Sequence, residues 1–131
     1  MERTAVNPVT WSKDMGFNQG ELITGATRIL HLSGQTAMSS DGTPQHEGDL
    51  AAQLSLSLDN VEGVLAAADM SLSNLVRLNV FATDVDELLQ NYGVLSGRLE
   101  AAGVAPTTTM LGVSRLAVPG QMVELDGIAA A

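Results

Sequence analysis

The sequence predicts an α+β domain in which two helices pack on a single mixed β-sheet. Three observations lead to this fold class: several short segments alternate apolar and polar residues, two longer segments repeat apolar residues every three or four positions, and the two kinds of segment are interleaved. At 131 residues the chain has the size of one ordinary domain. We therefore expect a single domain over residues 1–131.

The first two predicted strands lie in the segment ELITGATRILHLSGQT, residues 21–36, where a glycine separates two apolar runs. In the second run, Leu30 and Leu32 alternate with His31 and Ser33. Successive side chains of a strand point to opposite faces, so the two faces of this strand differ chemically.

The first predicted helix covers about residues 49–69. Five aliphatic residues recur there at spacings of four, four, three and four, which places them in one stripe along a helix. A helix with one apolar stripe must bury it against another element, and the sheet is the available partner. The stripe consists of Leu50, Leu54, Leu58, Val61 and Leu65.

A third strand is predicted over NLVRLNVFATD, residues 74–84, because apolar and polar residues alternate there. One face of this strand would then join the core, and the other would meet solvent or a neighbouring molecule. The expected core face carries Val76, Leu78, Val80 and Ala82, and the opposite face carries Arg77, Asn79 and Phe81.

A second helix is expected to start after Asp84, because Glu87 three residues later completes the pattern of a helix N-cap. Its stripe is Leu88, Tyr92, Leu95 and Leu99, and Gly103 marks its end. Two strand-like runs follow, TTTMLGVSRL and GQMVELDGIAA. The predicted order is β-β-α-β-α-β-β, with both helices on one face of the sheet. We therefore expect the other face of the sheet to be buried by oligomerisation.

The composition excludes several classes of protein. Cysteine is absent, which removes thiolate nucleophiles, Cys-ligated zinc and disulfides, and suits a reducing cytoplasm. Six basic against fifteen acidic residues give a net charge of −9, so nucleic acid is not an expected partner. Signal-peptide and membrane-span patterns are missing, and the only two histidines stand fifteen residues apart. We expect a soluble cytoplasmic protein without a metal or another cofactor.

Two pairs of polar residues are candidates for chemistry. His31 and Ser33 share a strand face, but such residues seldom bond to each other through their tips and no acid orients the histidine, so a structural, hydrogen-bonded histidine is favoured. Glu124 and Asp126 also share a face, and paired carboxylates can act as acid and base. Solvated charges at a sheet edge are the alternative interpretation.

Most of the chain resembles the Rid (YjgF/L-PSP) family of reactive intermediate deaminases. The stretches that carry the resemblance are ILHLSGQT, LVRLNVFATDVDE, QNYGVLSGRLEAAGVAPTTTMLGVSRL and VELDG. The resemblance implies a fold similar to that of chorismate mutase of the Bacillus type. It also implies a barrel-like homotrimer that binds a small metabolite in clefts between its subunits.

The resemblance further implies which residues form the site. The Ser-Gly-Gln motif of the family stands at residues 33–35, the asparagine of the second helix at Asn91, and the acid of the last strand at Glu124. Phe17 is the match for a tyrosine of the N-terminal loop and lacks its hydroxyl group. The expected catalytic residues are Glu124 and Ser33, and the expected substrate-binding residues are Phe17, Gly34, Asn91, Thr108 and Met110.

The chain departs from the family pattern at Thr108, where deaminating members have arginine. That arginine would clamp the carboxylate of an imino acid with two parallel hydrogen bonds, which a threonine hydroxyl cannot reproduce. Arg115 is expected further along the same strand, pointing to its opposite face, and Arg28 or Arg77 from a neighbouring subunit stays as an alternative source of charge. The sequence predicts a pocket that is polar but not cationic.

Two functions stay open. In the first, Glu124 positions a water or moves a proton on a small imine, enamine or related carbonyl compound that has no carboxylate anchor. In the second, the protein is a trimer that binds a small ligand or another protein without catalysis. The retained acid favours the first function, and the loss of the arginine and the tyrosine favours the second.

Overall fold

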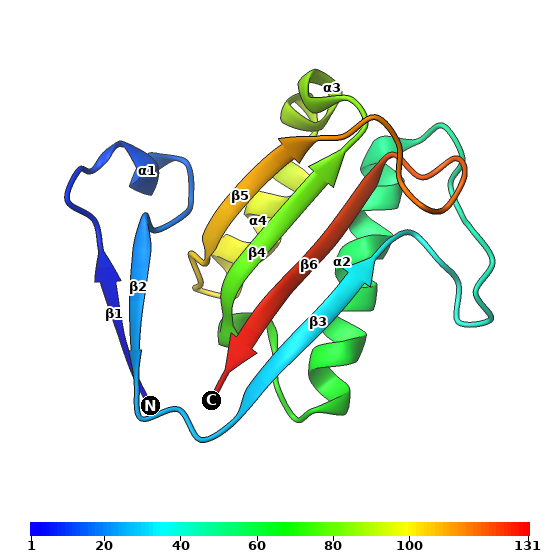
Figure 1. The fold of residues 1–131 in the computed structure, drawn as a ribbon. Coiled ribbons are helices and arrows are strands. Elements are labelled where there is room, and N and C mark those ends of the chain that lie inside the picture. Colours follow the sequence, from blue (N-terminus) through cyan, green and yellow to red (C-terminus); the bar gives the residue numbers. More distant parts are fainter.

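The computed structural model describes residues 1–131 and confirms the α+β class (Figure 1). A 3-10 turn, Leu72–Asn74, precedes β4. The elements are β1 (Glu2–Val6), α1 (Trp11–Asp14), β2 (Gly20–Thr24), β3 (Ile29–Gln35), α2 (Leu50–Ala67), β4 (Leu75–Ala82), α3 (Val85–Gln90), α4 (Gly93–Ala101), β5 (Thr107–Gly112) and β6 (Val123–Ala130).

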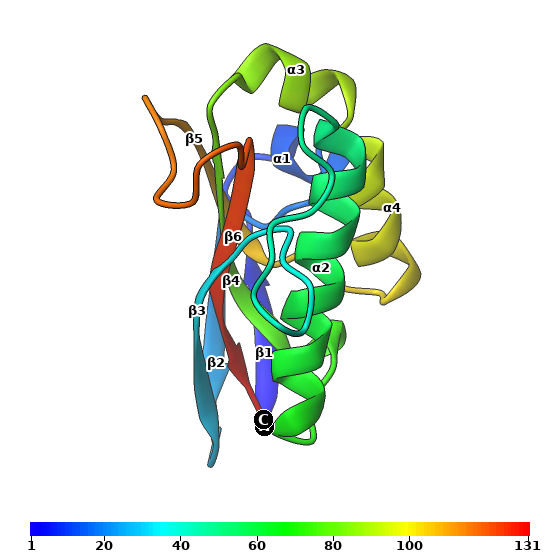
Figure 2. The same cartoon turned by 90° about the vertical axis from the view of Figure 1, so that its right-hand side faces the viewer.

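The main sheet has four strands in the order β3-β6-β4-β5, with β4 and β5 parallel and the other pairs antiparallel. Helices α2 and α4 lie on one face of this sheet, and no helix lies on the other (Figure 2). We call the first the covered face and the second the open face. None of the helices combines the length and apolar character needed to cross a membrane.

Helix α2 confirms the predicted stripe. Asp49 caps the helix by accepting a hydrogen bond from the Ala52 N–H at 3.1 Å, and Leu54, Leu58 and Leu65 are fully buried against the sheet. Burying one such leucine side chain stabilises a fold by ~1.5–3 kcal/mol relative to leaving it in water. The stripe therefore fixes α2 on the covered face.

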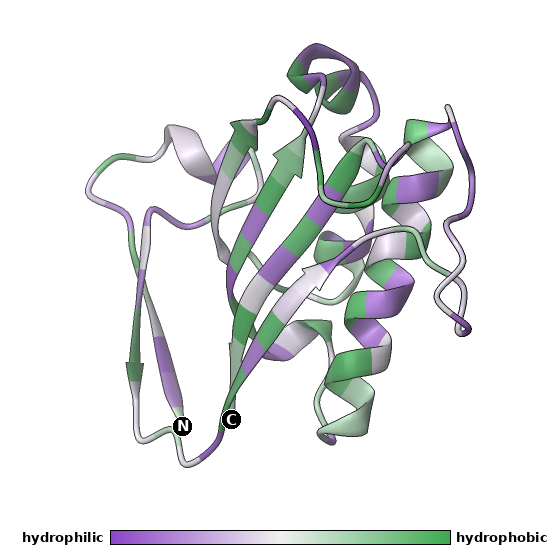
Figure 3. Cartoon of the chain, turned by 45° about the vertical axis from the view of Figure 1, so that its right-hand side comes forward, coloured by the Kyte–Doolittle hydropathy of each residue, from purple (hydrophilic) through white to green (hydrophobic).

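Strand β4 differs from the prediction at one position. Leu75 pairs with Ala129 while Arg77 pairs with Ile128, so the register shifts at Val76 and one residue is inserted there. Leu75 is consequently buried and Val76 is only half-buried, which makes the assignment of Val76 to the core wrong. Beyond this shift the alternation is as predicted, and Figure 3 shows hydrophobic and hydrophilic residues alternating along the sheet strands.

The second predicted helix is divided into α3 and α4 at Asn91. Asp84 caps α3 through the Glu87 N–H at 3.1 Å, as expected. The side chain of Asn91 then donates to the Glu87 carbonyl at 2.9 Å, and this local bond competes with the continuation of the helix. The stripe survives the break, because Leu88, Leu95 and Leu99 are buried.

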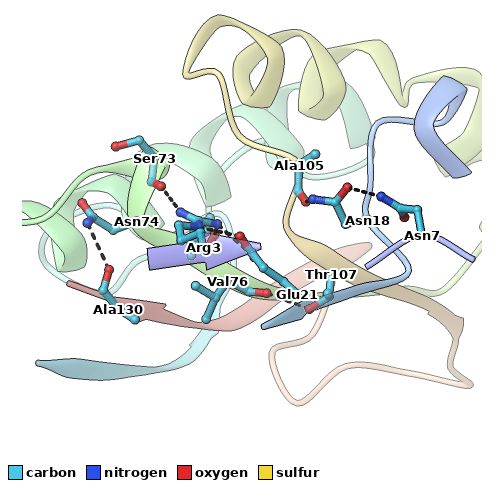
Figure 4. Close-up of polar contacts among 11 residues, drawn as sticks. Arg3, Asn7, Asn18, Glu21, Ser73, Asn74, Val76, Ala105, Thr107 and Ala130 are labelled. Carbon is cyan, nitrogen blue, oxygen red and sulfur yellow. Dashed lines mark hydrogen bonds and ion pairs between the residues drawn. The ribbon is translucent and has the colours of Figure 1, made fainter. Parts of the chain in front are cut away.

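The N-terminal strand β1 was not predicted. It pairs with β2 in a separate two-stranded sheet, and Arg3 ties this hairpin to the domain (Figure 4). The Arg3 guanidinium bonds to the Glu21 carboxylate at 2.5 and 3.0 Å, and to the backbone carbonyls of Ser73 and Leu75. The hairpin thus lies beside the first residues of β4.

Candidate functional site

Glu124 lies on the open face near the start of β6, a central strand of the sheet. Its strand, β6, is flanked by β3 and β4, and Glu124 itself pairs with Phe81, so the alternative of charges at a sheet edge is wrong. Asp126, two residues on, accepts a hydrogen bond from the Asn79 amide at 2.6 Å. No hydrogen bond or ion pair within the chain engages the Glu124 carboxylate. The two acids are therefore held differently, and only Glu124 is free to act on a ligand.

Gly34 forms the wall against which the Glu124 carboxylate rests. The pairing of β3 with β6 is irregular between Leu32 and Gln35, so Ser33 and Gly34 form a bulge. A Cβ atom on Gly34 would lie 2.1 Å from Oε1 of Glu124 and 2.7 Å from its Cδ, closer than any side chain tolerates. Only glycine leaves room for the carboxylate in this position, and the exposed Ser33 adjoins it.

Thr108 and Met110 lie on the other side of the sheet. On β5, Thr108 pairs with the buried Leu78 and Met110 pairs with the buried Val80, which assigns both to the covered face. The Thr108 hydroxyl donates to the Pro106 carbonyl at 2.8 Å, and Met110 packs against the core. A single chain therefore does not bring these two residues into one pocket with Glu124.

Phe17 belongs to the loop between α1 and β2, and Asn91 stands between α3 and α4. Phe17 contacts Trp11 edge to face, with ring centroids 5.9 Å apart, and the next N–H, that of Asn18, bonds to the Ala105 carbonyl at 3.3 Å just before β5. Asn91 ends α3. The predicted binding residues are thus distributed around the β5 end of the domain.

A cleft of about 610 Å³ borders these residues but excludes Glu124 and Ser33. Its volume falls within the range of ~300–1,000 Å³ that is usual for small-molecule pockets. Burial raises the pKa of Tyr92 above its ordinary value, so the phenol in this cleft stays a protonated hydrogen-bond donor at neutral pH. The lining residues are Lys13, Asp14, Met15, Gly16, Tyr92, Ser96, Leu99, Glu100, Gly103, Val104 and Ala105.

Two expectations for individual residues were wrong. Strand β5 ends at Gly112, so Arg115 lies in the following loop and is exposed, not further along the strand. His31 is exposed and its imidazole makes no hydrogen bond, because the open face has no element that could supply a partner. No group of three or more His, Asp or Glu side chains is placed to hold a metal ion.

The sequence analysis missed one contact at the site. Arg77 on β4 donates a hydrogen bond to the Thr109 hydroxyl on β5, at 2.5 Å on the open face. The alternation along β4 had placed Arg77 on this face. Its parallel pairing with β5, which brings Thr109 within reach, could not be read from the alternation.

The comparisons with known proteins agree with this fold. The family model for endoribonuclease L-PSP matches residues 15–131. The chain belongs to this family, also known as Rid or YjgF. The RutC family protein YjgH of Escherichia coli is 29% identical over 117 residues, which cover 89% of this chain and 88% of the relative.

Two crystal structures extend the comparison to three dimensions. The conserved Rid family protein YyfB from Yersinia pestis covers 100% of both chains with a TM-score of 0.84 and 28% identity. The structure of Escherichia coli TdcF with bound serine covers 88% of this chain and 87% of TdcF, with a TM-score of 0.72 and 26% identity. The Rid-family assignment therefore rests on both sequence and fold.

Proposed function

We propose that this Rid-family protein hydrolyses a small reactive imine, enamine or related carbonyl compound, with Glu124 as the group that moves the proton. The observation that carries the proposal is the unpaired Glu124 carboxylate held against the Gly34 backbone. Glu124 is half-buried in one chain, and covering the open face would remove its carboxylate from water. Such burial is disfavoured unless a ligand or a second chain engages the carboxylate, so Glu124 is a candidate for a functional group.

The reaction needs one water and one proton carrier. Glu124 accepts a proton from the water as its oxygen bonds to the imine carbon, and returns that proton to the nitrogen to give a carbinolamine. Glu124 then takes the proton of the new hydroxyl group and passes it to the nitrogen, so the C–N bond breaks to release ammonia or an amine and the carbonyl product. The exposed hydroxyl of Ser33, on the bulge beside Gly34, would orient the substrate. No cofactor is required for this step.

The site would be completed by a second copy of the chain. The open face has no intrachain cover, and Thr108 and Met110 belong to the covered face, so they do not join Glu124 within one chain. A barrel-like homotrimer joined through the open faces would place the β5 end of one subunit beside Glu124 of the next. The structure of TdcF with bound serine shows that a relative with this fold accepts a ligand of amino-acid size.

Selectivity would differ from that of a 2-iminoacid deaminase. Thr108 offers a hydroxyl that is already bonded to the Pro106 carbonyl, and no guanidinium stands at that position. A carboxylate bound there would be buried without a cation, which costs several kcal/mol. The preferred substrate would therefore have no carboxylate next to its reactive carbon.

Glu124→Gln tests the proposal, because glutamine keeps the shape of the side chain but cannot take the proton. Imines and enamines, generated from a panel of amines and carbonyl compounds, would be followed by the release of the carbonyl product. We expect the substitution to lower turnover by ~10²-fold or more while the oligomeric state is unchanged. Asp126→Asn is the matched control, since Asp126 already bonds to Asn79 and should affect turnover much less. Wild-type turnover in Glu124→Gln would refute the mechanism.

A second function is supported by a specific observation. Phe17 lacks the hydroxyl that the family's tyrosine supplies, and Thr108 lacks the charge, so the chain fits a ligand-binding trimer that has lost catalysis. Calorimetry on the same panel separates the two functions: binding of carbonyl products without any turnover would favour this alternative. For either function we expect a cytoplasmic location.

A further inference from the structure

Arg77 is the only lysine or arginine on the strands of the open face, which also carries His31. Its guanidinium donates to the Thr109 hydroxyl, and it forms no ion pair within the chain. Asp126, the acid nearest to it in the strand pairing, is bonded to Asn79 instead. An arginine has five N–H donors in a planar fork, so most of the Arg77 donors are free.

The other five basic residues have different surroundings. Arg3 is paired with Glu21, Arg98 is paired with Asp59 and Glu62, and Arg28 bonds to the Ala68 carbonyl. Lys13 and Arg115 are exposed on α1 and in the loop after β5. In a chain with a net charge of −9, a half-buried guanidinium without an acidic partner is a specific feature that favours an anion.

The distance between Arg77 and Glu124 sets the length of a ligand that could contact both residues. Thr109, which holds the guanidinium, pairs with Asn79, and Glu124 pairs with Phe81 two residues further along. Two residues span ~7 Å along a strand and two strand spacings span ~10 Å across the sheet, so Thr109 and Glu124 are roughly 12 Å apart. The two charged groups are at least that far apart, because the Arg77 guanidinium leans toward β5 and the Glu124 carboxylate leans toward β3. Hydrogen bonds at both ends take up about half of this distance.

We propose that Arg77, oriented by Thr109, binds a carboxylate that is separated by several bonds from the carbon on which Glu124 acts. The inference rests on the proposed function and names its substrate class: an imine or enamine of an oxo acid with a remote carboxylate. A 2-iminoacid cannot satisfy both groups, because its carboxylate is attached directly to the reactive carbon. Arg77 thereby supplies the charge that Thr108 does not, at a different point of the pocket.

Binding of product analogues tests the inference without requiring turnover. The probes are levulinate, whose ketone and carboxylate are separated by two methylene groups, its uncharged methyl ester, and pyruvate, whose groups are adjacent. By calorimetry on the assembled wild-type protein, we expect levulinate to bind at least tenfold more tightly than methyl levulinate and than pyruvate. Equal affinity of levulinate and its ester would overturn the proposal.

Substitutions then locate the interaction. Arg77→Gln should lower the affinity for levulinate to that of the ester, whereas Arg115→Gln, which removes the same charge from an exposed loop, should leave it unchanged. Thr109→Val keeps the charge of Arg77 but removes the acceptor of its hydrogen bond, and it should lower the affinity for levulinate a few-fold. Thr107→Val is the matched control and should leave this affinity unchanged, because the Thr107 hydroxyl bonds to the Val76 carbonyl.

Three results distinguish the possible failures. If Arg77→Gln dissociates the protein into monomers, Arg77 is part of the interface between copies and the inference is wrong. If Arg77→Gln has no effect on levulinate while Glu124→Gln abolishes turnover, the proposed function stands and only the anion site is refuted. If Glu124→Gln retains turnover but levulinate binding depends on Arg77, the anion site stands and the proposed mechanism fails.

Discussion

The two faces of the four-stranded sheet are built from alternate residues of the same strands, yet they differ in burial and in the charged side chains that they carry. On the covered face, Leu78, Val80 and Leu125 are at most 1% exposed and pack under α2 and α4. On the open face, Arg77 and Glu124 are only partly buried, and neither has a charged partner in the chain. The covered face is complete within one chain, whereas the open face has no cover within the chain and would be completed by a second copy in the proposed trimer.

The largest effect is expected on the covered face. Leu125→Ala removes a side chain that is 0% exposed, and such truncations lower the free energy of unfolding by ~2–5 kcal/mol. Urea denaturation should show this loss at every protein concentration, because Leu125 contacts only its own chain. A loss that disappears at high concentration would mean that the covered face also depends on association.

On the open face, Phe81→Asp should break the assembly and spare the fold. Phe81 is half-buried opposite Glu124, so an aspartate there would place two like charges side by side on the face that the proposed trimer buries. Light scattering should change from a trimer to a monomer, while the far-ultraviolet circular dichroism stays the same. A wild-type protein that is already monomeric at micromolar concentration would remove the shared pocket altogether.

Two glycines on adjacent strands sharpen the contrast between side-chain and backbone contacts. Gly34→Ala drives a Cβ atom into the end of the flexible Glu124 side chain, which can swing away, so we expect a ~10–100-fold loss of turnover with little change in stability. Gly127→Ala drives its Cβ atom to 2.3 Å from the Arg77 carbonyl oxygen, which belongs to the backbone and cannot swing away.

Thermal unfolding together with initial rates distinguishes these two variants. Gly127→Ala should lower the melting temperature clearly and Gly34→Ala should not. If Gly34→Ala keeps full turnover, the contact between Gly34 and Glu124 does not position the catalytic group.

The sequence was informative about the covered face and much less so about the open face. The stripe of α2 and the alternation in β4 follow from burial, which every chain must achieve with its own residues, and this is why positions such as Leu58 and Val80 could be predicted. The shift at Val76 could not, because a bulge inserts a residue without changing the composition of the strand.

The candidate site depends on pairings between distant segments. That Gly34 meets Glu124 requires β3 to lie beside β6, and that Thr109 meets Arg77 requires β5 to run parallel to β4. Alternation reports the face of a residue but not its neighbour on the next strand. The family resemblance supplied Ser33, Gly34 and Glu124. Arg77 lies in LVRLNVFATDVDE, one of the stretches that carry the resemblance, but the resemblance assigns no role to that position, so Arg77 was named only as an alternative source of charge.

The smallest effect that we predict is that of a substitution at Thr108. This substitution tests whether a second chain completes the site. Thr108→Arg restores the guanidinium at the family position, and in the proposed trimer this side chain would reach the Glu124 of the neighbouring subunit across the β5 end. Calorimetry should then show ~10-fold tighter binding of 2-ketobutyrate, equivalent to ~1.4 kcal/mol, while Thr108→Met, similar in length but uncharged, should gain nothing. Within one chain, Thr108 pairs with the buried Leu78 on the covered face, so an arginine there could not contact a ligand held by Glu124 of the same chain. If the gain in affinity is lost on dilution to monomers, the pocket lies between subunits. If Thr108→Arg forms a folded trimer and gains no affinity, Thr108 is not part of the site, and Arg77 is the only remaining candidate for binding the anion.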